Sequence, residues 1–202
     1  MKKLILVTPN PVLFQEWKEV FKDYKGVKIV YGFFEELEEF DCMVSAANSF
    51  GLMDGGVDYA IIKFFGTDLE KRVQQKIIEE YRGEQPIGTS MIVETYHKKH
   101  PFIAHTPTMR VPLTISRTDY VYKAMFAMLL SVHKHNIDDK NHIKINTVVC
   151  CGLGAGTGKV PEKEVARQME LAYKNFHNPP SKIDWNYAYQ RQKEIIFGGN
   201  LF

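Results

Sequence analysis

Four glycines within seven residues form the segment of this sequence best suited to binding an anionic ligand. The segment, Gly152 to Gly158, follows a run of β-branched residues and precedes Pro161, a residue type that favours the first turn of a helix. Glycines let a backbone bend until several N–H groups point into one concavity, and a following helix adds positive potential there. The pattern predicts a phosphate-binding loop between a strand and a helix, with a purely structural connection as the alternative. We call this segment the glycine loop.

The glycine loop departs from two well-defined phosphate motifs. A dinucleotide-binding fingerprint needs glycine at position 157, where this chain has Thr157. Gly158-Lys159 resembles the end of a Walker loop, but that motif needs glycine at position 153 and a hydroxyl at position 160, which are Leu153 and Val160. The sequence therefore does not predict a nucleoside triphosphatase.

A second loop, from Asn48 to Asp58, has a similar character. Gly55-Gly56 precedes a predicted helix and offers further backbone donors. Asp58 falls in the first helical turn, where its ordinary role is to complement the helix dipole, and Asn48 follows a strand, where asparagine is typically a turn former. Two loops that suit phosphate suggest a diphosphate ligand, with Asn48 and Asp58 beside one end of it.

The elements that position these loops alternate between strands and helices. Hydrophobic periodicity predicts strands at 3–8, 27–31, 42–47, 89–96, 102–106 and 145–151. Helical spacing is predicted at 13–24, 57–65, 68–81, 118–135, 161–176 and 185–197. This order indicates one α/β domain, a sheet with helices on both faces that binds ligands outside the carboxyl ends of its strands. Because both loops follow strands, we expect them to open onto that edge.

Charge and hydropathy exclude several classes of partner. Lysine plus arginine number 26 and aspartate plus glutamate 24, a formal charge of +2, so neither nucleic acid nor an anionic membrane is a predicted partner. The apolar run Leu4 to Val7 is too short for the core of a signal peptide, and no segment approaches the length of a membrane span. We expect a cytoplasmic protein.

Cysteines and histidines do not form an obvious metal or disulfide framework. The cysteines are Cys42, Cys150 and Cys151, an odd number that we expect to be reduced thiols on buried strands. The seven histidines lack cysteine or carboxylate partners at ligand spacing, so no metal and no cofactor is predicted. A nucleophilic Cys151 assisted by His105 is an alternative site chemistry.

These residues together resemble the signatures of macrodomains, the ADP-ribose-binding and Appr-1''-p-processing family. The segment 41–49, ending in Ser-Ala-Ala-Asn-Ser and continuing to Gly55-Gly56-Val57-Asp58, is similar to the first signature, and Gly152 to Pro161 to the second. Residues 88–107 resemble the middle of the fold, and Thr108 to Pro112 resembles the phage and bacterial branch. The resemblance implies a three-layer α/β/α fold with a mixed sheet, a macrodomain over 1–180, and a C-terminal extension, 181–202, packed on it.

The resemblance also implies a site and an activity. It implies a module that binds ADP-ribose or an ADP-ribosylated substrate, and hydrolysis of ADP-ribosyl derivatives such as ADP-ribosylated protein or the ADP-ribose phosphomonoester. Asn48 would bind the distal ribose, and Asp58 would position or activate a water near the anomeric carbon. The remaining ligand-binding residues implied are Ala47, Gly55, Gly56, Val57, Gly154, Ala155, Gly156, Thr157 and Gly158.

Several positions depart from the family pattern. Gly32-Phe33-Phe34-Glu35 stands where the family has Gly-Asp-Ile, so Phe33 or Phe34 is a candidate to stack on the base in place of the adenine-reading acid. Ser45 replaces the first asparagine of Asn-Ala-Ala-Asn, and Lys159 is a candidate phosphate partner where an aromatic residue is usual. The alternatives to a hydrolase are a non-catalytic ADP-ribose reader and a drifted macrodomain that binds another nucleotide or partner.

Overall fold

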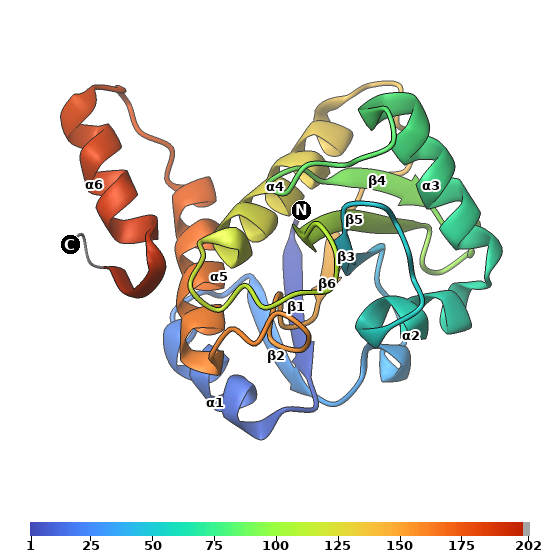
Figure 1. Cartoon of the computed structure of the whole chain (residues 1–202), viewed down its shortest axis with the longest axis horizontal. Helices are drawn as coiled ribbons and strands as arrows, with labels where there is room; N and C mark the ends of the chain where they lie inside the picture. The colour runs from blue at the N-terminus through green and yellow to red at the C-terminus, as the bar shows by residue number, and fades with distance from the viewer. Residues whose placement is uncertain (200–202) are drawn as a thin grey trace.

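The centre of the fold is a six-stranded sheet, seen in a computed structural model that describes residues 1–199 (Figure 1). The strand order is β2-β1-β6-β3-β5-β4. The strands are β1 (Lys3–Thr8), β2 (Val27–Tyr31), β3 (Cys42–Asn48), β4 (Met91–Glu94), β5 (Phe102–Met109) and β6 (Thr147–Cys150). The first five in spatial order pair in parallel, and only β4 runs antiparallel to its neighbour β5. The sheet is therefore mixed, and the carboxyl ends of its parallel strands share one edge.

Helices cover both faces of this sheet, which gives three layers (Figure 1). Side chains alternate along the buried strands, so Leu4 and Leu6 join one core while Ile5 and Val7 join the other. The first core is covered by α1 (Pro11–Val20), α4 (Tyr120–Ile137) and α5 (Glu162–His177), and the second by α2 (Gly56–Phe65) and α3 (Asp68–Tyr81). Across residues 1–199, none of the helices has both the length and the apolar character needed to cross a bilayer.

The strand β5 extends beyond its predicted end at residue 106. Proline cannot donate an N–H group to a strand ladder, which disfavours Pro107 inside a strand. In the structure β4 pairs with β5 only as far as Met91 opposite His105, so Pro107 has no β4 residue beside it. On the other side Pro107 stays in register with Ala47 of β3. All eight residues of β5 are buried, and its extension carries Thr108 and Met109 to the carboxyl edge.

The C-terminal helix α6 (Trp185–Ile195) lies outside α5 (Figure 1). None of its residues is buried, but Arg167 of α5 holds its end. The Arg167 guanidinium donates to the carbonyl oxygens of Glu194 at 2.8 Å and Ile196 at 2.9 Å, while Glu164 fixes the same group at 2.8 Å. The attachment within the described residues is thus mainly polar, and residues 200–202 of the predicted extension lie outside that range.

We expect Arg167→Ala to loosen the C-terminal end of α6, while Arg191 of α6 still donates to Tyr122 Oη at 3.2 Å. Two hydrogen bonds from a charged donor would be lost, and such bonds contribute about 1.5–3 kcal/mol each when shielded from water. Hydrogen exchange in 185–195 should accelerate about tenfold or more, the equivalent of about 1.4 kcal/mol of local stability, while exchange in the sheet stays unchanged. The exposed Arg117 provides the control variant Arg117→Ala. Equal protection of α6 in both variants would show that Arg167 does not hold the helix.

Candidate functional site

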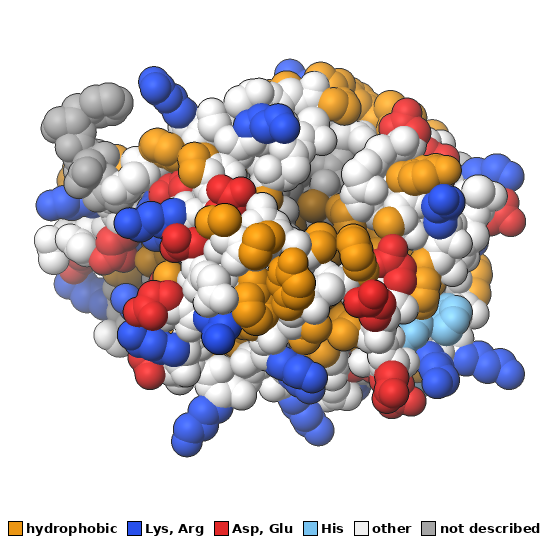
Figure 2. Space-filling model, turned by 90° about the horizontal axis from the view of Figure 1, so that it is seen from below, with side chains coloured by type: hydrophobic (Ala, Val, Ile, Leu, Met, Phe, Trp, Pro, Cys, Tyr) orange, Lys and Arg blue, Asp and Glu red, His pale blue; other side chains and the backbone are white. Residues whose placement is uncertain are grey.

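A cavity of about 220 Å³ opens at the carboxyl edge of the sheet. The end of β3, the segment 52–58, the segment 108–112 and the glycine loop all line it. Figure 2 views the molecule from this side and shows hydrophobic side chains gathered around a hollow. The exposed apolar residues at this edge include Val12 and Phe33, which follow the ends of β1 and β2, and Tyr31, which is the last residue of β2. The two loops predicted to meet are therefore brought to one cavity.

Backbone hydrogen bonds hold the glycine loop in a compact shape. Val160 donates its N–H to the oxygen of Gly154 at 3.1 Å, and Ile115 donates to that of Gly158 at 2.8 Å. Gly154 has a φ of 71°, which favours glycine. The N–H groups of Gly156 and Thr157, which line the cavity, have no acceptor within residues 1–199. These donors are available to a ligand.

The amino end of α2 supplies a second set of donors. Its N-cap is Gly55, which has no side chain to cap the first turn, and the first N–H that bonds back within the helix is that of Tyr59, to Gly55 oxygen at 3.2 Å. The N–H groups of Gly56 and Val57 have no acceptor in the described part of the chain. Both residues line the cavity. Free N–H groups and the helix dipole together favour an anion here.

Asp58, in the first turn of α2, is a buried carboxyl group that lines the cavity. It is 5% exposed, and the Ser45 hydroxyl donates to its Oδ1 at 2.7 Å. Burial raises the pKa of Asp58 to about 7, opposed by the hydrogen bond from Ser45 and assisted by the charge of Glu70. Near neutral pH the group is divided between its two protonation states, so it can take up or release a proton during a reaction.

Asn48 is half-buried at the end of β3 and forms the turn that follows. Its Oδ1 accepts from the N–H groups of Phe50 at 3.1 Å and Leu52 at 3.3 Å, and its Nδ2 donates to Leu52 oxygen at 2.7 Å. The default expectation for this residue, a turn former, is thus confirmed. One hydrogen of Nδ2 remains for a ligand, because an amide nitrogen carries two.

Four of the predicted ligand residues do not line the cavity: Phe33, Phe34, Ala155 and Lys159. Phe34 is 2% exposed and packs edge-to-face on Phe64, with the ring centroids 5.6 Å apart. Its ring is therefore part of the core, and the expectation that it stacks on a base is wrong. Its neighbour Phe33 is 55% exposed at the same edge of the sheet. The Lys159 side chain is exposed, and Ala155 packs against the first core.

Other residues that line the cavity were not predicted from the sequence as ligand contacts. They are Ala46, Leu52, Asp54, Thr108, Met109, Pro112, Cys151 and Gly152. The signal for three of them was present in the Thr108 to Pro112 motif, which was used only to assign the family branch. Burial and the charges of Glu35 and Asp58 raise the pKa of the Cys151 thiol to about 12, so it is protonated at neutral pH.

The alternative nucleophile pair has no geometric support. His105 is fully buried, and its Nδ1 hydrogen-bonds to Gln85 Oε1 at 2.6 Å rather than to Cys151. Burial lowers the pKa of His105 to about 3, so the ring is neutral in the folded protein. A neutral histidine held by a glutamine on a core strand is a structural residue.

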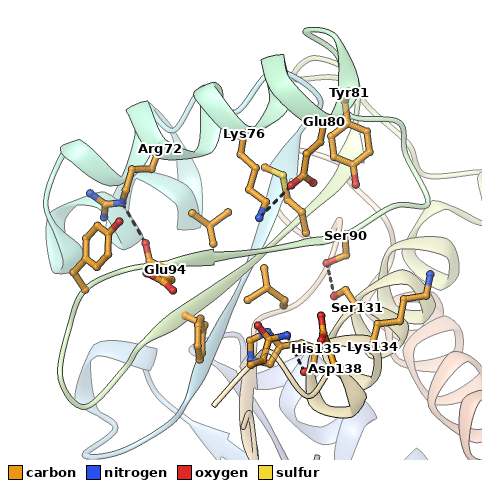
Figure 3. A pocket seen from close by; sticks show the side chains of 16 residues that line it. Arg72, Lys76, Glu80, Tyr81, Ser90, Glu94, Ser131, Lys134, His135 and Asp138 are labelled. Atoms are coloured by element: carbon orange, nitrogen blue, oxygen red, sulfur yellow. Dashed lines mark hydrogen bonds and ion pairs between the residues drawn. The ribbon is translucent and has the colours of Figure 1, made fainter. Parts of the chain in front are cut away.

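A larger cavity, of about 660 Å³, runs along the free edge of β4 between α3 and α4 (Figure 3). Its walls carry both signs of charge, with Lys76 and Glu80 paired at 3.3 Å and Arg72 bonded to the Glu94 carbonyl oxygen at 3.2 Å. No residue of either predicted loop lines it. The candidate site is therefore the smaller cavity, where the uncapped backbone donors lie.

Comparison with known proteins agrees with this architecture. A model of the Macro domain family matches residues 44–169. An uncharacterized protein of Aquifex aeolicus (strain VF5) is 32% identical over 150 residues, which is 74% of this chain and 82% of that protein.

Solved macrodomains share the fold at lower identity. The macrodomain of Mycobacterium tuberculosis DarG is 19% identical with a TM-score of 0.58, covering 71% of this chain and 87% of that one. The Oceanobacillus iheyensis macrodomain with ADP is 23% identical with a TM-score of 0.57, covering 70% and 72%. A mutant of the same macrodomain with ADPR is 18% identical with a TM-score of 0.59, covering 96% and 92%. The extent of the family match and the relative at 32% identity establish that this chain belongs to the macro domain family.

Proposed function

We propose that this protein binds ADP-ribose in the cavity at the carboxyl edge and hydrolyses ADP-ribosyl derivatives there. The observation that carries the proposal is the pair of uncapped backbone donor sets on one cavity that the buried Asp58 also lines. The solved relatives with ADP and ADPR support the choice of ligand.

The two donor sets suit the two phosphates of a diphosphate. Gly56 and Val57 supply N–H groups at the start of a helix, and Gly156 and Thr157 supply them from the glycine loop. Backbone donors bind anions without a long side chain to order, and no charged side chain is needed at the phosphate itself. The exposed Phe33 would contact the base at the outer end of the site.

In the proposed reaction Asp58 serves the distal ribose. The ionised carboxylate accepts a proton from a water molecule as the water oxygen bonds to the anomeric carbon. The bond from that carbon to the leaving oxygen breaks, and the leaving group takes a proton from solvent. Asn48 orients the ribose hydroxyls through its remaining Nδ2 hydrogen. Positioned general-base catalysis of this kind contributes about 10²–10⁴-fold to a rate.

A non-catalytic ADP-ribose reader is the second candidate, and one observation favours it. Both polar atoms of the Asn48 side chain are already bonded to its own turn, which limits how firmly it can hold a ribose. A reader would bind ADP-ribose through the same backbone donors and leave the ligand intact. A drifted domain for another nucleotide would instead bind nucleotides that lack the distal ribose equally well.

Calorimetric titration with ADP-ribose, ADP and AMP in parallel tests these candidates. We expect micromolar affinity for ADP-ribose, weaker binding of ADP, and the weakest binding of AMP, because each loses contacts with one part of the cavity. Incubation with an ADP-ribosylated protein and with the ADP-ribose phosphomonoester then separates hydrolase from reader. No heat with ADP-ribose at high excess would refute the proposed ligand, and equal affinity for ADP and ADP-ribose would favour the drifted domain.

A further inference from the structure

Ser45 and Asp58 form a buried pair beneath the cavity. Ser45 lies on β3 and is 0% exposed, and Asp58 on α2 is 5% exposed. The Ser45 hydroxyl donates to Asp58 Oδ1 at 2.7 Å, and this is the hydroxyl's only hydrogen bond within residues 1–199. Asp58 lines the cavity whereas Ser45 does not, so the serine reaches the carboxyl from the side of the sheet.

We infer that Ser45 is a positioning residue that orients the Asp58 carboxyl and keeps it available as a proton acceptor at the cavity. The hydrogen bond fixes Oδ1 against the sheet. The other carboxylate oxygen, Oδ2, has no protein donor in the described part of the chain and is left for a water molecule. This inference rests on the proposed function, since it gives Asp58 a role only if the cavity holds the substrate's ribose.

The electrostatics around Asp58 make this one hydroxyl important. Burial and the carboxylate of Glu70 on α3 both disfavour the charged form of Asp58. Cys151, after β6, is a neutral thiol whose pKa is itself raised by Asp58, and Glu35 adds negative charge on that same side. None of these facing groups is a cation. The Ser45 hydroxyl is the side chain among them that stabilises the ionised form of Asp58.

The same pair involves a position that departs from the family pattern. The resemblance places asparagine at position 45, whereas a serine hydroxyl is a single donor, and within residues 1–199 it donates to Asp58 alone. Ser45 stands opposite His105 of β5 in register, and that ring is neutral and bonded to Gln85. His105 therefore does not compete for the serine.

The direct test is a titration of Asp58 in the ligand-free protein by carbon-13 NMR of labelled aspartate carboxyls, with the Asp58 signal assigned by its absence in Asp58→Asn. We expect Ser45→Ala and the nearly isosteric Ser45→Cys to raise the pKa of Asp58 by about one unit, a tenfold change, because a good donor to the carboxylate is lost. Ser45→Thr restores the hydroxyl and should return the pKa toward the wild-type value.

Ser131→Ala is the matched control. It also removes a partly buried serine hydroxyl, which donates to the Met128 oxygen at 2.9 Å and lies 3.1 Å from Ser90 Oγ, away from this cavity. It should leave the titration of Asp58 unchanged. A folded Ser45→Ala or Ser45→Cys protein with the wild-type Asp58 titration would overturn the inference.

Calorimetry with ADP-ribose on the same proteins separates this inference from the proposed function. A shifted Asp58 titration without any ADP-ribose binding would uphold the coupling of Ser45 to Asp58 and refute the proposed ligand. Binding of ADP-ribose together with an unshifted Asp58 titration in the Ser45 variants would uphold the proposed ligand and refute the coupling of Ser45 to Asp58. Where the wild type hydrolyses a substrate, the acid limb of its rate profile should move about one pH unit upward in Ser45→Ala, with little change in KM.

Discussion

Gly158→Ala should lower the affinity for ADP-ribose about 100-fold or more, equivalent to about 2.7 kcal/mol. A Cβ at this position would lie 2.6 Å from the backbone oxygen of Gly154 and 2.8 Å from Ile115 Cγ1. Backbone cannot rotate away as a side chain can, so the glycine loop must shift. The N–H groups of Gly156 and Thr157 would move with it and lose the arrangement that is proposed to hold a phosphate. Calorimetry with ADP-ribose measures the loss directly.

Gly156, two residues earlier in the same loop, provides a control for the steric clash predicted in Gly158→Ala. A Cβ there would meet no atom within 4 Å, so Gly156→Ala should change the free energy of unfolding by less than about 0.5 kcal/mol. Gly158→Ala should reduce it by about 1–3 kcal/mol, since overpacking displaces the loop and Ile115 together. Both variants are compared by thermal unfolding without ligand. Equal stability of the two, with wild-type affinity in Gly158→Ala, would show that the loop accommodates a side chain.

Asp58→Asn should slow turnover strongly and stabilise the protein at alkaline pH. The folded-state pKa of Asp58, about 7, lies above the value of about 3.9 for an unfolded chain. Between these two values the folded protein retains a proton that the unfolded chain releases. The stability this confers is therefore complete below about pH 4 and is lost as the pH rises to 7, after which the buried charge disfavours the folded state in full.

Asparagine carries no charge and removes this pH dependence. The advantage of Asp58→Asn over the wild type should grow by up to about 4 kcal/mol between pH 4 and pH 8, the free energy equivalent to the difference between the folded and unfolded pKa values. Thermal unfolding across that range measures it. The exposed acid Asp54, which lines the same cavity, gives the control Asp54→Asn, for which we expect no such trend. A constant difference between Asp58→Asn and wild type would contradict the raised pKa.

Asp58→Asn should also have a large effect on activity. In a hydrolase, Asp58→Asn should lower kcat about 10²–10⁴-fold while leaving the affinity for ADP-ribose within a few-fold, because the proposed diphosphate contacts are backbone N–H groups. Asp54→Asn should retain turnover. Undiminished hydrolysis by Asp58→Asn would remove this residue from the proposed mechanism, whereas equal loss of binding and turnover would assign it to ligand binding.

The sequence by itself was sufficient for the type and order of the main helices and strands, and for the prediction that the two loops meet. The predicted bounds of β1, β2 and α3 agree with the structure, because each is a strongly patterned segment ended by a clear breaker or cap. The parallel order of the strands then brings the segments after β3 and β6 to one edge, since carboxyl ends of parallel strands lie together. The hydrophobic pattern of each segment and the geometry of parallel strands were enough to predict that the two loops meet.

Only the tertiary structure decided which side chains face the cavity and in what state. Phe33 and Phe34 are equivalent by type, yet one is exposed and the other is packed on Phe64, a residue 30 positions away. The bond from Ser45 to Asp58 joins a strand to the helix that covers it, and the raised pKa of Asp58 follows from the burial produced by that packing. Burial and side-chain contacts depend on how the layers assemble, and local sequence carries no information on the distance between residues of different layers.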